Sequence, residues 1–172
     1  MKPNSYGNQR VPLNKEMGCG ILRSECITLR PIAYVSNGWS KPPRFGWQEV
    51  VSEIWFRTGL GEHLVGLDEF SHCYVLFWMH HNTKALQERA RVHPRGQEDL
   101  PLVGVFATHS PYRPNPIGLT VVELVHFSEG SLWVRGLDAL HGSPVLDIKS
   151  YVPSRNEKPL VLYPDWIRQL GG

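Results

Sequence analysis

Residues 104–119 read GVFATHSPYRPNPIGL, and this stretch decides which fold the rest of the chain predicts. Apolar residues on both sides of the prolines indicate a strand before them (Leu102–Phe106) and another after them (Leu119–Leu124). Proline fixes its own φ and favours extended backbone in the residue before it. The three prolines therefore predict a stiff, extended loop, in which Arg113 and Asn115 would lose little entropy on binding a ligand. A proline-rich crossover that only joins two strands would account for the same pattern.

Short apolar segments separated by glycine and proline turns predict an all-β chain. Strands are expected at residues 27–35, 50–57, 72–80, 119–127, 132–137 and 145–148. In residues 50–57 the side chains alternate, with Ser52, Ile54 and Phe56 on one side. Residues 72–80 are almost all apolar, which is typical of a strand that is covered on both faces. The pattern predicts a single-domain β-barrel with short helical additions and long loops.

The chain divides into three parts by composition. Residues 1–26 are polar and contain several glycines, and we expect a flexible extension there. Residues 27–153 are expected to form the barrel, and residues 154–172 a tail with a short helical turn. Helical turns are predicted at residues 62–67, 83–90 and 164–170.

Composition excludes several classes of protein. The 172 residues suffice for one domain with a real core, and 41% hydrophobic with 20% charged residues is ordinary for a soluble protein. No apolar run approaches the roughly 20 residues that cross a bilayer, and the first residues do not resemble a signal peptide, so neither a membrane partner nor secretion is expected. Cys19, Cys26 and Cys73 form no Cys-x-x-Cys pair, which favours reduced thiols in a cytoplasmic protein. The eight histidines lack metal-ligand spacing, so no metal is expected.

Positive charge is concentrated in one polar segment. The formal net charge of +2 is too small to indicate a nucleic-acid partner by itself. However, the segment contains four basic residues opposed inside it only by Glu88: Lys84, Arg89, Arg91 and Arg95. These side chains could contact RNA phosphates, which would make binding strongly dependent on salt, or they could simply form a solvated surface.

Four motifs taken together resemble a known family. They are GLDEFSH at residues 66–72, Met79-His80 at the end of an apolar strand, the stretch 104–119, and LDALHGSPVLDIK at residues 137–149. In this order and spacing they resemble the TrmO-like (TsaA-like) family of small β-barrel methyltransferases that depend on S-adenosylmethionine. The resemblance covers residues 29–153. It implies methylation of N6 of threonylcarbamoyladenosine beside the tRNA anticodon, by a homodimer in which two barrels share the cofactor site.

The resemblance also implies a cofactor site built from loops. The implied contacts are Pro43, Arg44, Phe45, Met79, His80, His109, Leu119, Asp138, Leu140, His141, Gly142 and Ser143. Apolar and aromatic groups would suit the adenine, backbone groups of the turn at residues 140–143 its edge, and a carboxylate the ribose or amino group. A Rossmann site is disfavoured, because Gly18-Cys19-Gly20 lacks the third glycine of a dinucleotide turn.

The residues that would act on the substrate remain alternatives. The candidates for catalysis are Arg113, Asn115, Asp138 and His80. His80 could instead be a core histidine, although its place at the end of the strand favours a ligand contact, and Asp138 could be only a turn former. His109 stands where the family typically has arginine, which always carries charge and binds carboxylates with two donors, whereas histidine donates once and titrates near neutrality. Two other functions stay open: the same cofactor chemistry on another acceptor, and a non-catalytic nucleic-acid or regulatory binding module.

Overall fold

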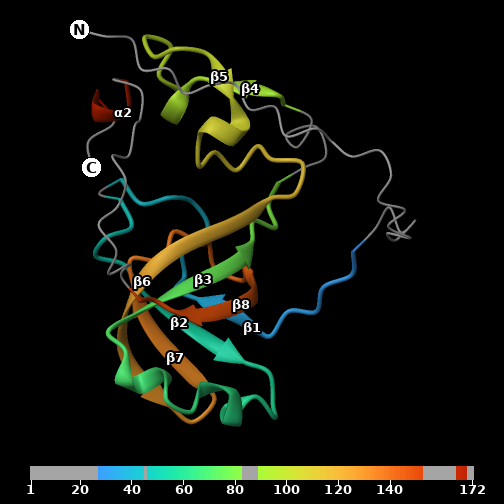
Figure 1. Cartoon of the computed structure of the whole chain (residues 1–172), viewed down its shortest axis with the longest axis vertical. Coiled ribbons are helices and arrows are strands. Elements are labelled where there is room, and N and C mark those ends of the chain that lie inside the picture. The colour runs from blue at the N-terminus through green and yellow to red at the C-terminus, as the bar shows by residue number, and fades with distance from the viewer. Residues whose placement is uncertain (1–26, 45, 83–88, 153–165, 170–172) are drawn as a thin grey trace, which may run out of the picture.

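A computed structural model describes residues 27–44, 46–82, 89–152 and 166–169. Its centre is a closed antiparallel barrel of six strands in the order β1-β2-β7-β6-β3-β8 (Figure 1). The strands are β1 (Ala33–Ser36), β2 (Val51–Phe56), β3 (His72–Trp78), β6 (Ile117–Ser128), β7 (Ser131–Arg135) and β8 (Pro144–Ser150). The prediction of an all-β barrel with short helical additions is confirmed.

Smaller elements lie at the two ends of the barrel. The 3-10 turns η1 (Gly61–Leu64) and η2 (Leu67–Glu69) lie at one end. At the other end, residues 89–116 form an arm that connects β3 to β6 (Figure 1). The arm contains the two-stranded ribbon of β4 (Arg91–Val92) and β5 (Val103–Gly104), with the 3-10 turns η3 (Pro94–Gly96) and η4 (Val105–Ala107). The short helix α2 (Trp166–Gln169) confirms a helical turn in the part of the tail that the structure describes.

The barrel core follows from strand alternation. Ser52, Ile54 and Phe56 all point inward and are buried, as the sequence predicts. In β3 the inward residues are fully buried, whereas the outward ones are only half-buried, so the expectation of two covered faces holds for one face. The inward side chains of all six strands form one apolar cluster that fills the barrel.

One close contact fixes β6 against β3. Phe77 lies directly opposite Gly118 in the register, and its ring covers the glycine so closely that an added Cβ would lie 2.2 Å from the Phe77 Cζ. Only glycine leaves room for the ring at this position. The PNPIG end of the proline stretch therefore positions the aromatic ring inside the barrel.

Two predicted strand boundaries are wrong. The first strand begins at Ala33 instead of residue 27, because Pro31 has no N–H to donate to a neighbouring strand. The strand expected at Leu102–Phe106 ends after Gly104 and continues as η4, with Phe106 77% exposed. The Val105 carbonyl accepts hydrogen bonds from the Thr108 amide and the Thr108 hydroxyl, and these local bonds compete with a strand ladder.

Other elements expected from the sequence agree more closely with the structure. A turn of Glu129 and Gly130 joins β6 to β7, and Gly130 has a φ of 82°, which glycine adopts without strain. A helical turn overlaps the expected residues 62–67 as η1, which begins one residue earlier. Residues 83–88 of the helix expected at residues 83–90, and the extension at residues 1–26, lie outside the described residues, whereas residues 89 and 90 are described and are not helical. Among the helices of the described residues, none has the length and apolarity to cross a membrane.

Candidate functional site

The site begins with a turn that is fastened to the barrel mouth. After β1, the side-chain amide of Asn37 donates to the Ser52 hydroxyl (2.9 Å) and to the Ala139 carbonyl (3.0 Å). Both partners lie far away in the sequence, and Ser52 is completely buried. Asn37 therefore holds the segment 139–143 against the first two strands and satisfies a buried hydroxyl at the same time.

His141 has a structural role in this turn. The backbone amides of Asn37 and Gly38 both donate to His141 Nδ1, at 3.2 Å each. A backbone N–H can only donate, so Nδ1 is the acceptor and the proton of the neutral ring is on Nε2. The amide of His141 donates to the Trp39 carbonyl (2.8 Å).

The turn uses its own backbone donors within the protein. Besides His141, the amide of Gly142 donates to the Val35 carbonyl (2.7 Å) and that of Ser143 to the Leu140 carbonyl (3.1 Å). These three N–H groups fasten the turn, so they are engaged before any ligand arrives. The family-implied contact of this turn with an adenine edge would have to use its other polar groups.

His80 joins the strand β3 to this turn. Its Nδ1 lies 3.2 Å from the Ser143 hydroxyl, and its Nε2 faces Gly142, where an added Cβ would be 3.9 Å away. Burial and the neighbouring His81, whose ring centroid is 4.0 Å away, both lower the pKa of His80. His80 is therefore neutral at physiological pH and can accept a proton.

Three further candidates are positioned by strands β3 and β6. Met79 follows β3, and its amide donates to the Pro116 carbonyl (2.8 Å), which ties the proline stretch to the end of that strand. Leu119 on β6 pairs with Leu76 and is 55% exposed. Asp138 is exposed and accepts a short hydrogen bond from the Thr120 hydroxyl, which orients its carboxylate.

The Arg113 side chain is engaged within the arm and does not extend freely into solvent. Its Nη1 donates to the carbonyls of Val105 (3.2 Å) and Thr108 (2.8 Å), and its guanidinium lies over the Phe106 ring at 5.5 Å. The side chain is half-buried and folds the arm back on itself. Asn115, by contrast, is exposed as expected.

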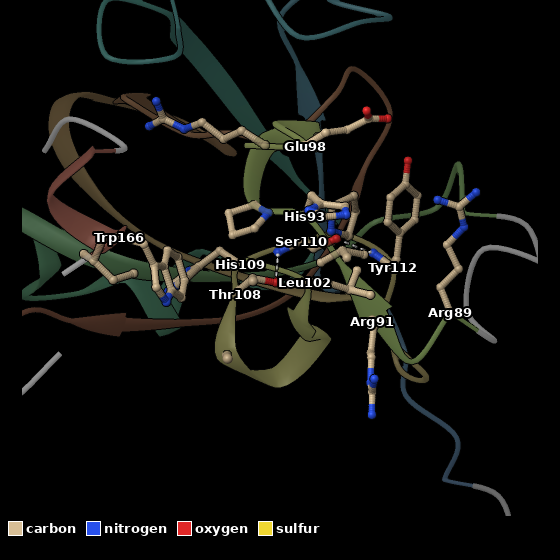
Figure 2. Close-up of a pocket in the computed structure, with 17 residues that line it drawn as sticks. Arg89, Arg91, His93, Glu98, Leu102, Thr108, His109, Ser110, Tyr112 and Trp166 are labelled. Atoms are coloured by element: carbon tan, nitrogen blue, oxygen red, sulfur yellow. Dashed lines mark hydrogen bonds between the residues drawn. The ribbon is translucent and has the colours of Figure 1, made fainter. Parts of the chain in front are cut away.

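A hollow lies between the arm and α2, and we call it the arm pocket. Its volume is about 890 Å³ (Figure 2). Its polar and aromatic lining residues are Arg89, Arg91, His93, Arg95, Glu98, Thr108, His109, Ser110, Tyr112 and Trp166. His109 is thus grouped with the three arginines, and across the described ranges no hydrogen bond or ring contact joins it to the cluster around His80.

The walls of the arm pocket are held by local hydrogen bonds. The Arg89 guanidinium lies over the Tyr112 ring, 5.2 Å from its centroid. His93 Nδ1 donates to the Leu100 carbonyl (2.7 Å). The Thr108 hydroxyl accepts from the Ser110 amide (3.2 Å), and the Ser110 hydroxyl from the Tyr112 amide (3.3 Å). The segment that carries Tyr112 is therefore preorganised by side-chain to backbone bonds as well as by prolines.

The other expected site residues lie in the loop between β1 and β2 or outside the residues that the structure describes. Pro43 is buried and Arg44 exposed, and they lie in the loop between β1 and β2. Phe45 and Lys84 lie outside the described residues. Within the part of the chain that the structure describes, no three His, Cys, Asp or Glu side chains gather closely enough to hold a metal ion. Sequence reasoning missed Asn37, whose signal is only an Asn-Gly pair after a strand.

The closed barrel with a site at its mouth and a basic arm defines a class of ligand-binding β-barrel that differs from the doubly wound nucleotide folds. The chain belongs to the family described as "tRNA-methyltransferase O N-terminal domain", which matches residues 40–157. This match confirms the resemblance on which the expected site residues depend.

Named relatives come from several kingdoms. The S-adenosyl-L-methionine-binding protein of Archaeoglobus fulgidus is 43% identical over 131 residues, which are 74% of this chain and 91% of that protein. The human tRNA (adenine(37)-N6)-methyltransferase is 42% identical over 104 residues, 60% of this chain but 23% of the human protein. The crystal structure of TrmO from Pseudomonas aeruginosa superposes with a TM-score of 0.63 at 30% identity, covering 82% of this chain and 62% of that one. The chain therefore spans less than two thirds of the solved TrmO chain.

Proposed function

We propose that this protein is an S-adenosylmethionine-dependent tRNA methyltransferase that acts on N6 of threonylcarbamoyladenosine beside the anticodon. The family membership and the names of the relatives support this function. The observation that carries it is the contact between His80 and Ser143, because it joins two family motifs that are 63 residues apart around a neutral, proton-accepting ring.

The residues at the barrel mouth fit such a cofactor. Met79 and Leu119 offer apolar surface for an adenine, and the oriented carboxylate of Asp138 suits a ribose hydroxyl or an ammonium group. S-adenosylmethionine supplies a methyl group on a sulfonium, whose transfer depends mainly on positioning donor and acceptor. The rigid turn at residues 139–143 provides that positioning, since its backbone is fastened to β1 at several points.

His80 would assist the acceptor. The N6 proton of threonylcarbamoyladenosine lies between a purine and a carbonyl and is more acidic than that of adenosine. With the proton of the neutral imidazole on Nδ1 and donated to the Ser143 hydroxyl, Nε2 beside Gly142 is left as the acceptor for the N6 proton. Arg113 would act as a positioning residue, because its bonds to Val105 and Thr108 shape the arm.

The arm would contact the tRNA. Arg89, Arg91 and Arg95 are exposed and lie together around the arm pocket. Lys84, which lies outside the described residues, is proposed as a further RNA contact from its place in the sequence alone. Phosphate contacts by these side chains would supply affinity that falls steeply with salt.

A cytoplasmic homodimer completes the proposal. The outer face of the barrel exposes Trp55 (58%), Trp133 (37%) and Tyr34 (37%) on neighbouring strands, an apolar surface suited to a second copy. Cys73 is a free thiol whose burial raises its pKa to about 12, so it resists oxidation and suits a reducing compartment. Light scattering of the purified protein measures the oligomeric state.

The test is methyl transfer to defined RNA. The protein is incubated with methyl-labelled S-adenosylmethionine and tRNA that carries threonylcarbamoyladenosine, and the nucleosides are analysed by mass spectrometry. We expect one added methyl group on N6 of the modified nucleoside and none on an unmodified transcript. Transfer to a small molecule instead would indicate another acceptor, and cofactor binding without transfer would indicate a binding module.

A further inference from the structure

We propose that the arm pocket is a subsite for an unpaired base of the bound RNA, with the paired Arg89 and Tyr112 as its stacking surface. This inference rests on the proposed function and deepens it, because it names the part of the substrate that the arm recognises. The pocket volume of about 890 Å³ lies within the range of pockets that enclose small ligands.

The flat groups of the pocket suit a nucleobase. The Arg89 guanidinium lies 5.2 Å from the Tyr112 ring centroid, a cation–π arrangement that keeps the two planes together. Unpaired RNA bases stack on aromatic rings and on arginine planes. Figure 2 shows Trp166 on the side of the pocket opposite Arg89 and Tyr112, so a second aromatic ring limits the space.

The charge of the pocket suits the phosphates that flank such a base. Three arginines line it, whereas Glu98 is the acidic residue among its lining. The whole chain carries a formal net charge of only +2, so this local excess is not a reflection of general basicity. A free aromatic ligand or an apolar peptide would not need these cations, and a phosphate-bearing base would use both features.

His93 adds a group that can contact the edge of the base. Its Nδ1 must donate to the Leu100 carbonyl, because a carbonyl oxygen only accepts. In the neutral ring Nε2 is then an acceptor, which complements the exocyclic amino group of adenine, cytosine or guanine. The pocket thus combines stacking, phosphate contacts and an acceptor for an amino group.

The pocket is also fixed relative to the barrel mouth. The Asn82 side chain donates to the Pro111 carbonyl, next to Tyr112 in the chain. The amide of Met79, beside His80, donates to the Pro116 carbonyl at the end of the same proline segment (2.8 Å). A base held in the arm would therefore set the position of the RNA relative to His80.

The experiment compares Tyr112→Leu with Tyr112→Phe. An anticodon stem-loop RNA carrying threonylcarbamoyladenosine is titrated by fluorescence anisotropy at several salt concentrations. Loss of one stacked base should weaken RNA binding by about 5- to 150-fold in Tyr112→Leu, with an unchanged salt slope and unchanged affinity for S-adenosylmethionine. Tyr112→Phe keeps the ring and should bind like the wild type. Phe70→Leu removes a ring that is 38% exposed beside η2 and serves as the matched control.

Each outcome supports or overturns the inference. Wild-type RNA affinity in Tyr112→Leu, or a loss of cofactor affinity in that variant, would overturn it. If Tyr112→Leu melts at a lower temperature than the wild type, Trp166→Leu gives the same comparison from the other side of the pocket. Methyl transfer by the wild type, measured on the same RNA, separates the two proposals: transfer with no dependence on Tyr112 refutes the subsite alone, and Tyr112-dependent binding without transfer refutes the proposed function alone.

Discussion

At the scale of single residues, the pair His80 and His81 shows how neighbours prepare a side chain for chemistry. Burial disfavours the charged form of His80, and the second histidine adds repulsion whenever both rings carry a proton. His80 thus keeps its role as a proton acceptor to lower pH than an ordinary histidine would. Its contact with Ser143 fixes the ring, so protonation state and orientation are set by different neighbours.

The pH dependence of methyl transfer should report this lowered pKa. The proposed mechanism uses neutral His80, so the rate should fall as pH decreases through a midpoint below the ordinary value of 6.5. His81→Gln removes the repulsion but leaves the burial, and it should shift the midpoint upward with an unchanged rate at pH 8. Rate profiles between pH 5 and 8, with proton NMR titration of His80, measure the shift. A midpoint that is the same in both proteins would contradict the effect of His81.

At the scale of elements, the contact between β3 and β6 explains why the proline stretch determines the fold. Near the end of the stretch, Gly118 lies beneath the Phe77 ring, where there is room for a hydrogen atom but not for a Cβ. This close contact fixes the register of β6, the longest strand of the barrel, against β3. Alternation predicted which side of β2 is buried, because a period of two depends only on local pleating. The end of β5 was not predictable in this way, since the donors that gather on the Val105 carbonyl come from Thr108 and from Arg113.

Gly118→Ala should destabilise the barrel. The new methyl group would overlap the Phe77 ring between two paired strands, and overpacking of this kind costs about 1–3 kcal/mol of unfolding free energy. Chemical denaturation measures the loss. Combining Gly118→Ala with Phe77→Leu should recover part of it, because the smaller side chain makes room.

Gly61→Ala is the control for this substitution. Gly61 lies in η1, and an added Cβ there would meet no atom within 4 Å. Its unfolding free energy should therefore match the wild type within about 0.5 kcal/mol. Equal stability of the Gly118 and Gly61 variants would show that the Phe77 ring can move aside.

The candidate site was predictable only to the extent that chemistry follows from local motifs. The motifs identified His80, Asp138 and the turn at residues 140–143, and the structure brings His80 against Ser143. The inward fold of Arg113 was not predictable, because its acceptors are backbone carbonyls whose direction depends on η4. The grouping of His109 with Arg95 likewise depends on how the arm closes.

At the scale of the whole molecule, charge is divided between the barrel mouth and the arm. The mouth holds neutral His80 and the carboxylate of Asp138, whereas the arm concentrates arginines. Arg95 is the one non-glycine residue with a positive φ (52°) among those that the structure describes. Asparagine and glycine adopt this backbone conformation more easily than arginine does. Backbone preference therefore does not explain an arginine here, and we infer that the position depends on its side chain.

Arg95→Asn should separate RNA binding from stability. Asparagine suits the left-handed conformation, so the melting temperature should stay equal or rise slightly. Loss of one phosphate contact should flatten the slope of log affinity against log salt by about 0.7–0.9. Arg57→Asn, at an exposed position that does not line the arm pocket, should leave the slope unchanged. Identical slopes in both variants would show that Arg95 is only a solvated charge.

The two strand ends that the arm connects lie side by side, because Trp78 at the end of β3 pairs directly with Ile117 at the start of β6. In topological terms the arm is therefore a long insertion in the connection between two paired antiparallel strands. The entropic cost of closing such a connection grows only slowly with its length. The barrel can accordingly tolerate lengthening, shortening or exchange of this connection without any change in strand order. The proposed RNA contacts of the arm can thus change by exchange of this connection, while the six strands of the barrel keep their order.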